Sequence, residues 1–310
     1  MAVEIGYLLP TRENVMQGRH EAAPLLALAE QAEALGYRSI WIGDSLLARP
    51  RHDPFTLMAA VAARTKKPLV GTAVLLPALR NPVVLAHMAA TIDQIAEGRL
   101  VLGVGIASDV PNVRDEFEAA GVPFEKRLGR MMEGLRLCRA LWSGEEVNWE
   151  GRWTVRRGVL GPLPHRKGGP LLWNAGSAEP TIERVGKFFD GWFPNGPSPA
   201  LFGERFAAMK QVARQAGRDP AQLAACAYLT LAVDDDEARA NRRMDDFMGQ
   251  YYGERPDSMR KRQACFAGTL EGARQWLGAY AAAGATHMCL RFAGDHERHL
   301  EMMAGIADRL

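Results

Sequence analysis

Short apolar runs alternate along the chain with longer runs in which apolar residues recur at helical spacing. Eight apolar runs have the length of a strand, and they cover residues 3–9, 38–44, 69–76, 99–105, 170–176, 189–194, 224–233 and 286–292. Helical runs occupy 21–36 and 124–142 and also begin at Pro54 and Pro82. The second, third and fourth strands recur about every 31 residues, the length of a strand, a helix and two short loops.

The predicted strands are continuously apolar rather than alternating, as in a parallel sheet that is covered on both faces. Eight strand–helix units without a break in composition favour an α/β fold of the (β/α)8 TIM-barrel type over an open doubly wound sheet, which stays the alternative. A chain of 310 residues is long enough for one such barrel, so we expect a single domain over residues 1–310.

Two segments exceed the minimal barrel. Residues 143–169, after the fourth helix of the repeat, carry glycines, prolines and short alternating runs, which predict a surface excursion with a small hairpin. Residues 244–266 follow the seventh strand, on the side where barrels place their catalytic loops. We interpret this second segment as a candidate lid.

Composition narrows the function classes. The chain is 47% hydrophobic and 24% charged, with a net charge of +2 and no dense basic run, so nucleic acid is not an expected partner. The sequence has no apolar stretch of membrane-spanning length and no secretory leader, which predicts a soluble cytoplasmic protein without a membrane partner. The four cysteines form no C-x-x-C pair and are expected to be reduced and mostly buried: Cys138, Cys226, Cys265 and Cys289.

If the chain is a barrel, its chemistry lies just after the strands. Asp44 and Ser45 follow the second strand and are candidate catalytic residues, although a turn or a helix cap also explains them. Gly176 and Ser177 lie between a strand and a helix, where free backbone N–H groups suit a phosphate. An ordinary turn capped by Ser177 is the alternative.

One glycine pattern resembles a dinucleotide-binding motif and one pair of histidines resembles part of a metal site, but both patterns are incomplete. Gly103 and Gly105 begin a dinucleotide-binding fingerprint, but Ser108 stands where the third glycine is needed. We therefore expect these glycines to let a flat ring lie against the barrel mouth. His296 and His299 are three residues apart without a third ligand nearby, so we predict a solvated helix N-terminus and no metal site.

Several stretches together are similar to a known family. They are "EALGYRSIWIGDSLLARPRHDPFTLMAAVAART", "VGTAVLLPALRNPVVLAHMAATIDQIAEGRLVLGVG", "EFEAAGVPFEKRLGRMMEGLRLCRALW" and "FFDGWFP". In this order they resemble the bacterial luciferase-like monooxygenases, which are flavin-dependent (β/α)8 enzymes. The stretch from Gly71 to Gly105 is the most specific part of the resemblance.

The resemblance implies a homodimer and a flavin-type ring across the carboxyl-terminal mouth of the barrel. It also implies a bulge in the third strand, often with a non-prolyl cis peptide, at Ala73 and Val74. Cofactor contacts after the fourth and fifth strands correspond to Ile106, Ala107, Ser108, Gly176 and Ser177.

Two departures from the family pattern limit the reaction. Bacterial luciferase carries an arginine where this chain has Ile106. The family's sugar-phosphate dehydrogenases have Asp-His after the second strand and an acid after the fourth, where this chain has Asp44-Ser45 and Ser108. Aldehyde luminescence and sugar-phosphate oxidation are therefore both disfavoured.

The expected function is a flavin-dependent oxidoreductase, in first place a two-component monooxygenase. It would use O2 and reduced FMN from a separate flavin reductase on a small organic substrate, with Arg12, Arg49, Tyr251 and Arg291 as substrate contacts. The first alternative is hydride transfer with the deazaflavin coenzyme F420, whose acidic tail Arg49, Arg51 and His52 would hold; a solvated loop explains these three residues equally well. The second alternative is a non-catalytic flavin-binding barrel.

Overall fold

A closed parallel barrel forms the centre of the computed structural model, which describes residues 3–310. It closes where Gly191 and Trp192 of β8 pair with Ala224 and Ala225 of β9. The barrel strands follow in the order β1 (Glu4–Leu8), β2 (Ser39–Ile42), β3 (Leu69–Leu75), β4 (Leu100–Val104), β7 (Leu171–Asn174), β8 (Gly191–Trp192), β9 (Ala224–Val233) and β11 (His287–Phe292). The predicted eight-stranded TIM barrel is therefore confirmed, although β8 has only two paired residues.

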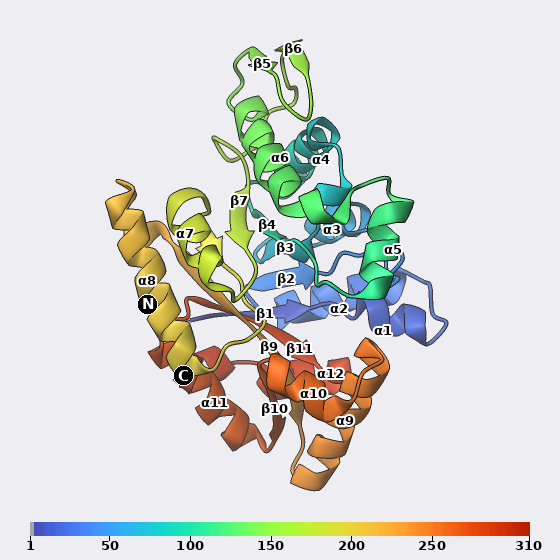
Figure 1. The fold of residues 1–310 in the computed structure, drawn as a ribbon. Coiled ribbons are helices and arrows are strands. Elements are labelled where there is room, and N and C mark those ends of the chain that lie inside the picture. Colours follow the sequence, from blue (N-terminus) through green and yellow to red (C-terminus); the bar gives the residue numbers. More distant parts are fainter. Residues whose placement is uncertain (1–2) are drawn as a thin grey trace.

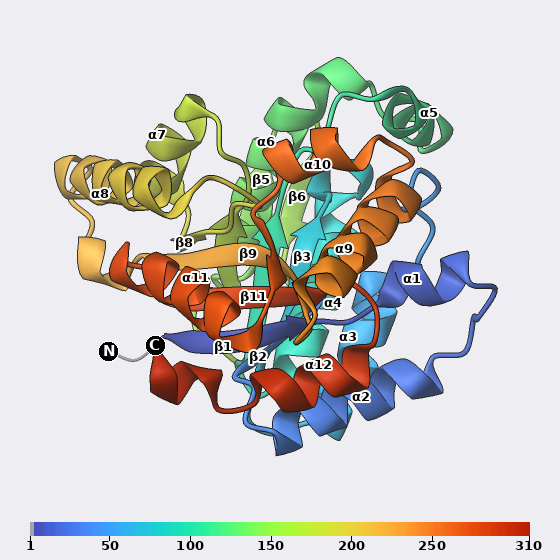
Figure 2. The same cartoon turned by 90° about the horizontal axis from the view of Figure 1, so that it is seen from below.

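Helices surround the sheet on its outer side, as Figures 1 and 2 show. Several of them begin at a side-chain cap: Asp53 accepts from the backbone N–H of Thr56, and Asn81 accepts from that of Val83. The helices are α1 (Thr11–Met16), α2 (Ala23–Ala34), α3 (Pro54–Arg64), α4 (Pro82–Ile95), α5 (Pro111–Ala119), α6 (Arg127–Leu141), α7 (Glu179–Phe188), α8 (Pro199–Gln215), α9 (Glu237–Tyr252), α10 (Pro256–Arg262), α11 (Leu270–Ala282) and α12 (His296–Met303).

Both predicted insertions have regular structure. The hairpin expected within 143–169 is present as the antiparallel pair β5 (Val147–Trp149) and β6 (Val155–Gly158), which projects from the barrel in Figure 1. The candidate lid, 244–266, contains the second half of α9, all of α10 and the start of β10 (Cys265–Gly268). β10 is a ninth strand of the sheet and pairs with the second half of β9. The sequence pattern did not predict this strand.

Aromatic side chains fill the barrel interior. The Trp41 ring lies 4.7 Å from that of Phe193 and 5.4 Å from that of Trp173, measured between centroids. Glycines on neighbouring strands make room for them: a Cβ on Gly103 would overlap the Thr72 carbonyl oxygen and lie 2.8 Å from the Phe193 ring. Gly103 is thus required by internal packing, rather than by the ligand ring that the sequence suggested.

His299 of α12 is buried and His296 is half-buried, so the prediction of a solvated helix N-terminus was wrong for His299. The His299 Nε2 accepts from the Val233 N–H at 3.0 Å, and its ring stacks on Phe292 at 5.2 Å. Burial lowers the pKa of His296 to about 3, and its Nδ1 lies 2.9 Å from the Tyr7 hydroxyl. The apolar side of this short helix places the His299 ring in the core, while His296 lines the larger cavity beside α1 and α2.

The remaining sequence expectations concern thiols, metals and membranes. All four cysteines are free, with Cys138, Cys226 and Cys289 buried and Cys265 half-buried. Within residues 3–310 there is no group of three or more His, Cys, Asp or Glu side chains that could hold a metal ion. No helix in the same range has the length and apolar character needed to span a bilayer.

The packing inside the barrel can be tested at Gly103. We expect Gly103→Ala to lower the free energy of unfolding by about 1–3 kcal/mol, because the added methyl has no space between Thr72 and Phe193. The matched control is Gly278→Ala in α11, where a Cβ would meet nothing within 4 Å and the helix should gain up to about 1 kcal/mol. Urea denaturation of both variants is the measurement, and equal stability would contradict this packing role.

Candidate active site

A cavity of about 300 Å³ opens at the carboxyl-terminal end of the barrel strands. The ends of β3, β4 and β7 form one part of its lining, and residues after β2 together with α9 and β11 form the other. Its lining residues are Asp44, Ser45, Arg49, Arg51, Ala73, Val74, Leu76, Gly105, Ile106, Ala107, Ser108, Val113, Glu116, Ala175, Gly176, Phe193, Asn195, Tyr228, Tyr251, Tyr252 and Arg291. This is the position at which barrels carry their catalytic groups.

One part of the cavity wall is the irregular end of β3. The pairing of β3 with β4 shifts register between Thr72 and Leu75, and the peptide bond between Ala73 and Val74 is cis. Both features were expected from the family resemblance. Gly105, just after β4, lies close to this bulge: a Cβ added to Gly105 would lie 2.9 Å from Val74 Cγ2. The wall therefore presents backbone and small side chains.

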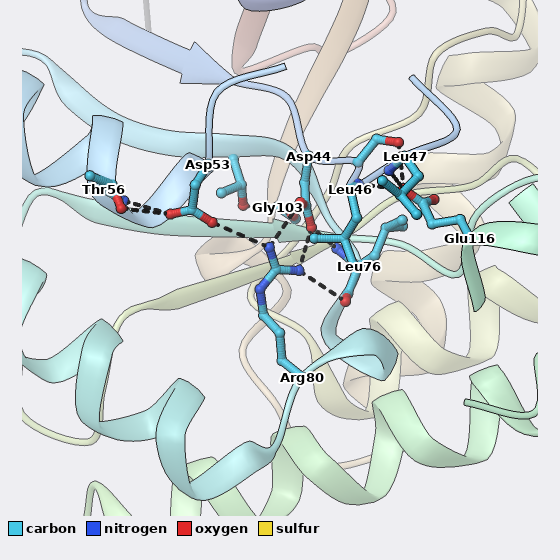
Figure 3. Close-up of polar contacts among 11 residues, drawn as sticks. Asp44, Leu46, Leu47, Asp53, Thr56, Leu76, Arg80, Gly103 and Glu116 are labelled. Carbon is cyan, nitrogen blue, oxygen red and sulfur yellow. Dashed lines mark hydrogen bonds and ion pairs between the residues drawn. The ribbon is translucent and has the colours of Figure 1, made fainter. Parts of the chain in front are cut away.

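Asp44 joins the ends of β2 and β3 through a buried ion pair (Figure 3). Its Oδ2 accepts from Arg80 Nη1 at 2.6 Å and from the Leu76 N–H at 2.9 Å, while its Oδ1 accepts from Arg80 Nη2 at 2.9 Å. The Asp44 side chain is 0% exposed. Because both carboxylate oxygens are engaged, Asp44 holds the bulge in place and offers no free base; its predicted catalytic role remains a prediction.

Ser45 is bound to an acid that the sequence analysis did not select. The Ser45 hydroxyl donates to Glu116 Oε1 at 2.7 Å, and the same oxygen accepts from the N–H groups of Leu46 and Leu47 (Figure 3). Glu116 is buried, lines the cavity, and its Oε2 has no hydrogen-bond partner within the described chain. The available signal was its place beside Val113 and Phe117 on the apolar side of α5.

Backbone N–H groups lie free at two neighbouring strand ends. Those of Ile106, Ala107 and Ser108, after β4, donate no hydrogen bond within residues 3–310, nor do those of Gly176 and Ser177 after β7. Ala107 has a φ of 65° and Gly176 a φ of 110°, so each loop turns through the left-handed region. Loops of this kind direct successive N–H groups toward an anion.

Arginines and tyrosines form the opposite side of the cavity. Arg291 on β11 and Arg49 and Arg51 after β2 all line it, as do Tyr228 of β9 and Tyr251 and Tyr252 of α9. Arg12 does not line the cavity but lies 4.6 Å from the centre of the Tyr251 ring. The predicted lid thus contributes two aromatic side chains from a helix.

The structure brings eleven of the thirteen predicted site residues to this cavity. They are Asp44, Ser45, Arg49, Ala73, Val74, Ile106, Ala107, Ser108, Gly176, Tyr251 and Arg291. Arg12 and Ser177 lie outside its lining, and the Ser177 carbonyl oxygen accepts from Arg205. Glu116, Tyr228 and Tyr252 line the cavity but were not predicted, and Arg80 joins the site by binding Asp44.

A second, larger cavity of about 1160 Å³ lies between α1, α2 and α9. Its lining mixes acids and bases, among them Glu13, Arg242, Asp246 and Glu297, and it shares only Tyr251 with the cavity at the strand ends. Since none of the strand-end residues after β2, β3, β4 or β7 lines it, we place the candidate active site in the smaller cavity.

The Asp44–Arg80 pair gives a direct stability prediction. We expect Arg80→Met to lower the free energy of unfolding by about 3–5 kcal/mol, because it leaves a buried carboxylate without its cation. Adding Asp44→Asn should restore at least about 1 kcal/mol, which a double-mutant cycle in urea would detect. The exposed pair of Arg64 and Glu30 is the control, where Arg64→Met should cost less than about 1 kcal/mol. Simple additivity of Asp44→Asn and Arg80→Met would contradict the coupling.

Comparison with known proteins agrees with this geometry. The model of the luciferase-like monooxygenase family matches residues 3–309. An F420-dependent glucose-6-phosphate dehydrogenase of Rhodococcus erythropolis is 31% identical over 225 residues, covering 70% of this chain. The match spans 66% of that relative, just under two thirds of its length.

Two solved structures share the fold over nearly their whole length. An F420-dependent secondary alcohol dehydrogenase, in complex with an F420–acetone adduct, superposes with a TM-score of 0.83 at 20% identity, covering 99% of this chain and 98% of that one. The monooxygenase RslO1 from Streptomyces bottropensis gives 0.84 at 22% identity, with coverage of 99% and 98%. The chain therefore belongs to the luciferase-like monooxygenase family.

Proposed function

We propose that this protein is a coenzyme F420-dependent oxidoreductase that transfers a hydride between the deazaflavin and a small organic substrate. The observation that carries the proposal is the cavity at the strand ends, with the Ala73–Val74 bulge in its wall and free N–H groups after β4 and β7. The similarity to an F420-dependent dehydrogenase at 31% identity supports coenzyme F420 over reduced FMN, the cofactor first expected from the sequence.

The residues present fit a flat tricyclic ring with an anionic tail. Beside the bulge, the cavity is walled by Gly105, Ala107, Ala175 and Gly176, none of which has a side chain larger than a methyl group. The free N–H groups after β4 and β7 would bind the phosphate of the tail, because oriented amides replace the hydration of an anion. The volume of about 300 Å³ lies at the lower end of the range for small-molecule sites.

When bound, coenzyme F420 supplies or accepts the hydride, and the chain's own residues position the reactants. Asp44 and Arg80 fix the bulge against which the ring would lie. Glu116 fixes the loop after β2 by accepting from Ser45 and from the Leu47 N–H. The tyrosines of α9 close the cavity on its outer side and exclude water.

Proton handling at the substrate oxygen falls to Tyr228 in this proposal. Its hydroxyl makes no hydrogen bond that the structure gives among residues 3–310, although Tyr228 lines the cavity. Burial raises the pKa of Tyr228 well above its usual value, so the phenol stays protonated at neutral pH and can donate to a substrate oxygen. Ser45 is less suitable, because its single proton already goes to Glu116.

The assembly and location predicted from sequence carry over as proposals. A homodimer in the cytoplasm is the expected form, with a small organic molecule as the substrate. Hydride transfer with coenzyme F420 needs no flavin reductase as a partner of this chain, unlike the monooxygenase first expected.

The proposal is tested by anaerobic titration with oxidised F420 and with reduced FMN. We expect F420 to bind at least about tenfold more tightly than reduced FMN, and Ala175→Leu to weaken F420 by at least about tenfold because it fills the ring site. Ala221→Leu is the matched control, since Ala221 is exposed and outside the cavity. Tighter binding of reduced FMN, or equal effects of the two leucines, would overturn the assignment.

A further inference from the structure

Arg291 carries a buried positive charge without a carboxylate partner. It lies on β11 with 1% of its surface exposed, and no acid lies within 4 Å of its guanidinium in the described part of the chain. Its nitrogens donate to the Thr230 and Tyr252 hydroxyls at 2.8 Å each and to Gln263 Oε1 at 3.4 Å, all of them neutral groups. Buried charges are normally paired with an opposite charge, so an unpaired guanidinium beside a cavity indicates that a ligand supplies the anion.

Aromatic rings surround this guanidinium and partly offset its loss of water. The Arg291 Cζ lies 5.0 Å from the ring centres of Phe247 and Tyr251, 5.2 Å from that of Tyr228 and 5.5 Å from that of Tyr252. Ring faces attract a cation, but the rings carry no net charge. The cage therefore fixes the orientation of the guanidinium without neutralising its charge.

Further arginines add to the positive charge on this side. Arg51 lines the cavity and donates to the Arg49 carbonyl oxygen at 3.0 Å and to the Tyr251 hydroxyl at 3.2 Å, neither of which is an anion. Burial lowers the pKa of Arg12, and the neighbouring charges of Arg51 and Arg49 lower it further. These guanidinium groups therefore repel one another on this side of the cavity.

The nearby carboxylates do not neutralise these arginines. Asp44 is paired with Arg80, and Glu116 accepts hydrogen bonds from the loop after β2. Glu13 of α1 forms no ion pair within residues 3–310. Burial raises its pKa, against the smaller, opposite effect of the charges of Arg291, Arg51 and Arg12. The Arg51 and Arg291 side of the cavity therefore keeps an excess of positive charge.

This positive side is separate from the free N–H groups proposed for the cofactor phosphate. In the closed barrel, β11 stands opposite β4, and β1 stands opposite β7. Arg291 belongs to β11 and Arg51 follows β2, whereas the free amides follow β4 and β7. One anionic group bound by the loops after β4 and β7 would leave the arginines without a partner.

We propose that Arg51 and Arg291 form an oxyanion subsite for the substrate, which is a small organic anion carrying a carboxylate, phosphate or sulfonate group. This inference rests on the proposed function, since the arginines would set the substrate's reacting carbon beside the cofactor ring. Charge-assisted N–H bonds from the two guanidinium groups to such an anion would fix its orientation as well as adding affinity. A neutral molecule of the same shape would leave both arginines unpaired and bind more weakly.

Benzoate and benzamide test the charge requirement, because they differ little in shape. Binding is measured by calorimetry on the F420-loaded protein and on the protein without cofactor. We expect wild type to bind benzoate at least about tenfold more tightly than benzamide. Arg51→Gln and Arg291→Gln should each remove most of this preference while changing benzamide binding by less than about twofold. Arg64→Gln, on the surface, is the control and should change neither.

The other source of an anion is the cofactor's own acidic tail. If the arginines bound that tail, Arg51→Gln would weaken the binding of F420 but not that of a deazaflavin lacking the acidic tail. Bound F420 would also abolish the binding of benzoate. Either result overturns the proposal. Equal binding of benzoate and benzamide by wild type also overturns it. If Arg291→Gln does not fold, the half-buried Arg51 still gives the comparison. Failure of wild type to bind any deazaflavin would refute the proposed cofactor. The preference for benzoate over benzamide is also measured on the protein without cofactor, so the two proposals can fail separately.

Discussion

A buried ion pair at the ends of two neighbouring strands determines the form of this site. Asp44 follows β2, and its two oxygens bind the Arg80 guanidinium and the Leu76 N–H just after β3. The β3 chain is therefore held where its register shifts, and the Ala73–Val74 peptide is presented to the cavity. The Asp44 carboxylate, whose catalytic role stays a prediction, fixes the backbone on which a cofactor ring would lie.

The charges of the site then divide into two regions. Loops after β4 and β7 offer free backbone N–H groups, while β11 and the loop after β2 offer arginines without acid partners. Between them lies a wall of small residues from the bulge and from Gly105. Two anion-binding regions on either side of a slot suit two ligands, one with a phosphate tail and one with its own negative group.

The sequence was informative where a local pattern is imposed by the fold. Continuous apolar runs located every barrel strand, and the strand-end rule placed Ser45, Ala107 and Arg291 at one cavity before any geometry was known. It failed where tertiary packing decides. Glu116 looks like a surface acid of an amphipathic helix until the loop after β2 folds over it.

Other misses have similar physical causes. His299 follows a charged stretch in sequence, yet the Val233 N–H and the Phe292 ring bury it. The short strand Cys265–Gly268 has too few residues for a period to be detected, and it exists because β9 continues past the barrel rim. The place of 244–266 after the seventh strand suggested a loop that serves as a lid, whereas the structure has two helices there, and the tyrosines of α9 reach the cavity.

The most direct test of this account is a crystal structure of the protein with coenzyme F420. The account predicts that the deazaflavin ring lies against the Ala73–Val74 peptide and that the phosphate accepts from the N–H groups of Ile106, Ala107 and Ser108. It also predicts that the Arg51 and Arg291 guanidinium groups remain free of the tail. Cofactor bound in the cavity between α1, α2 and α9, or a tail paired with Arg291, would contradict it.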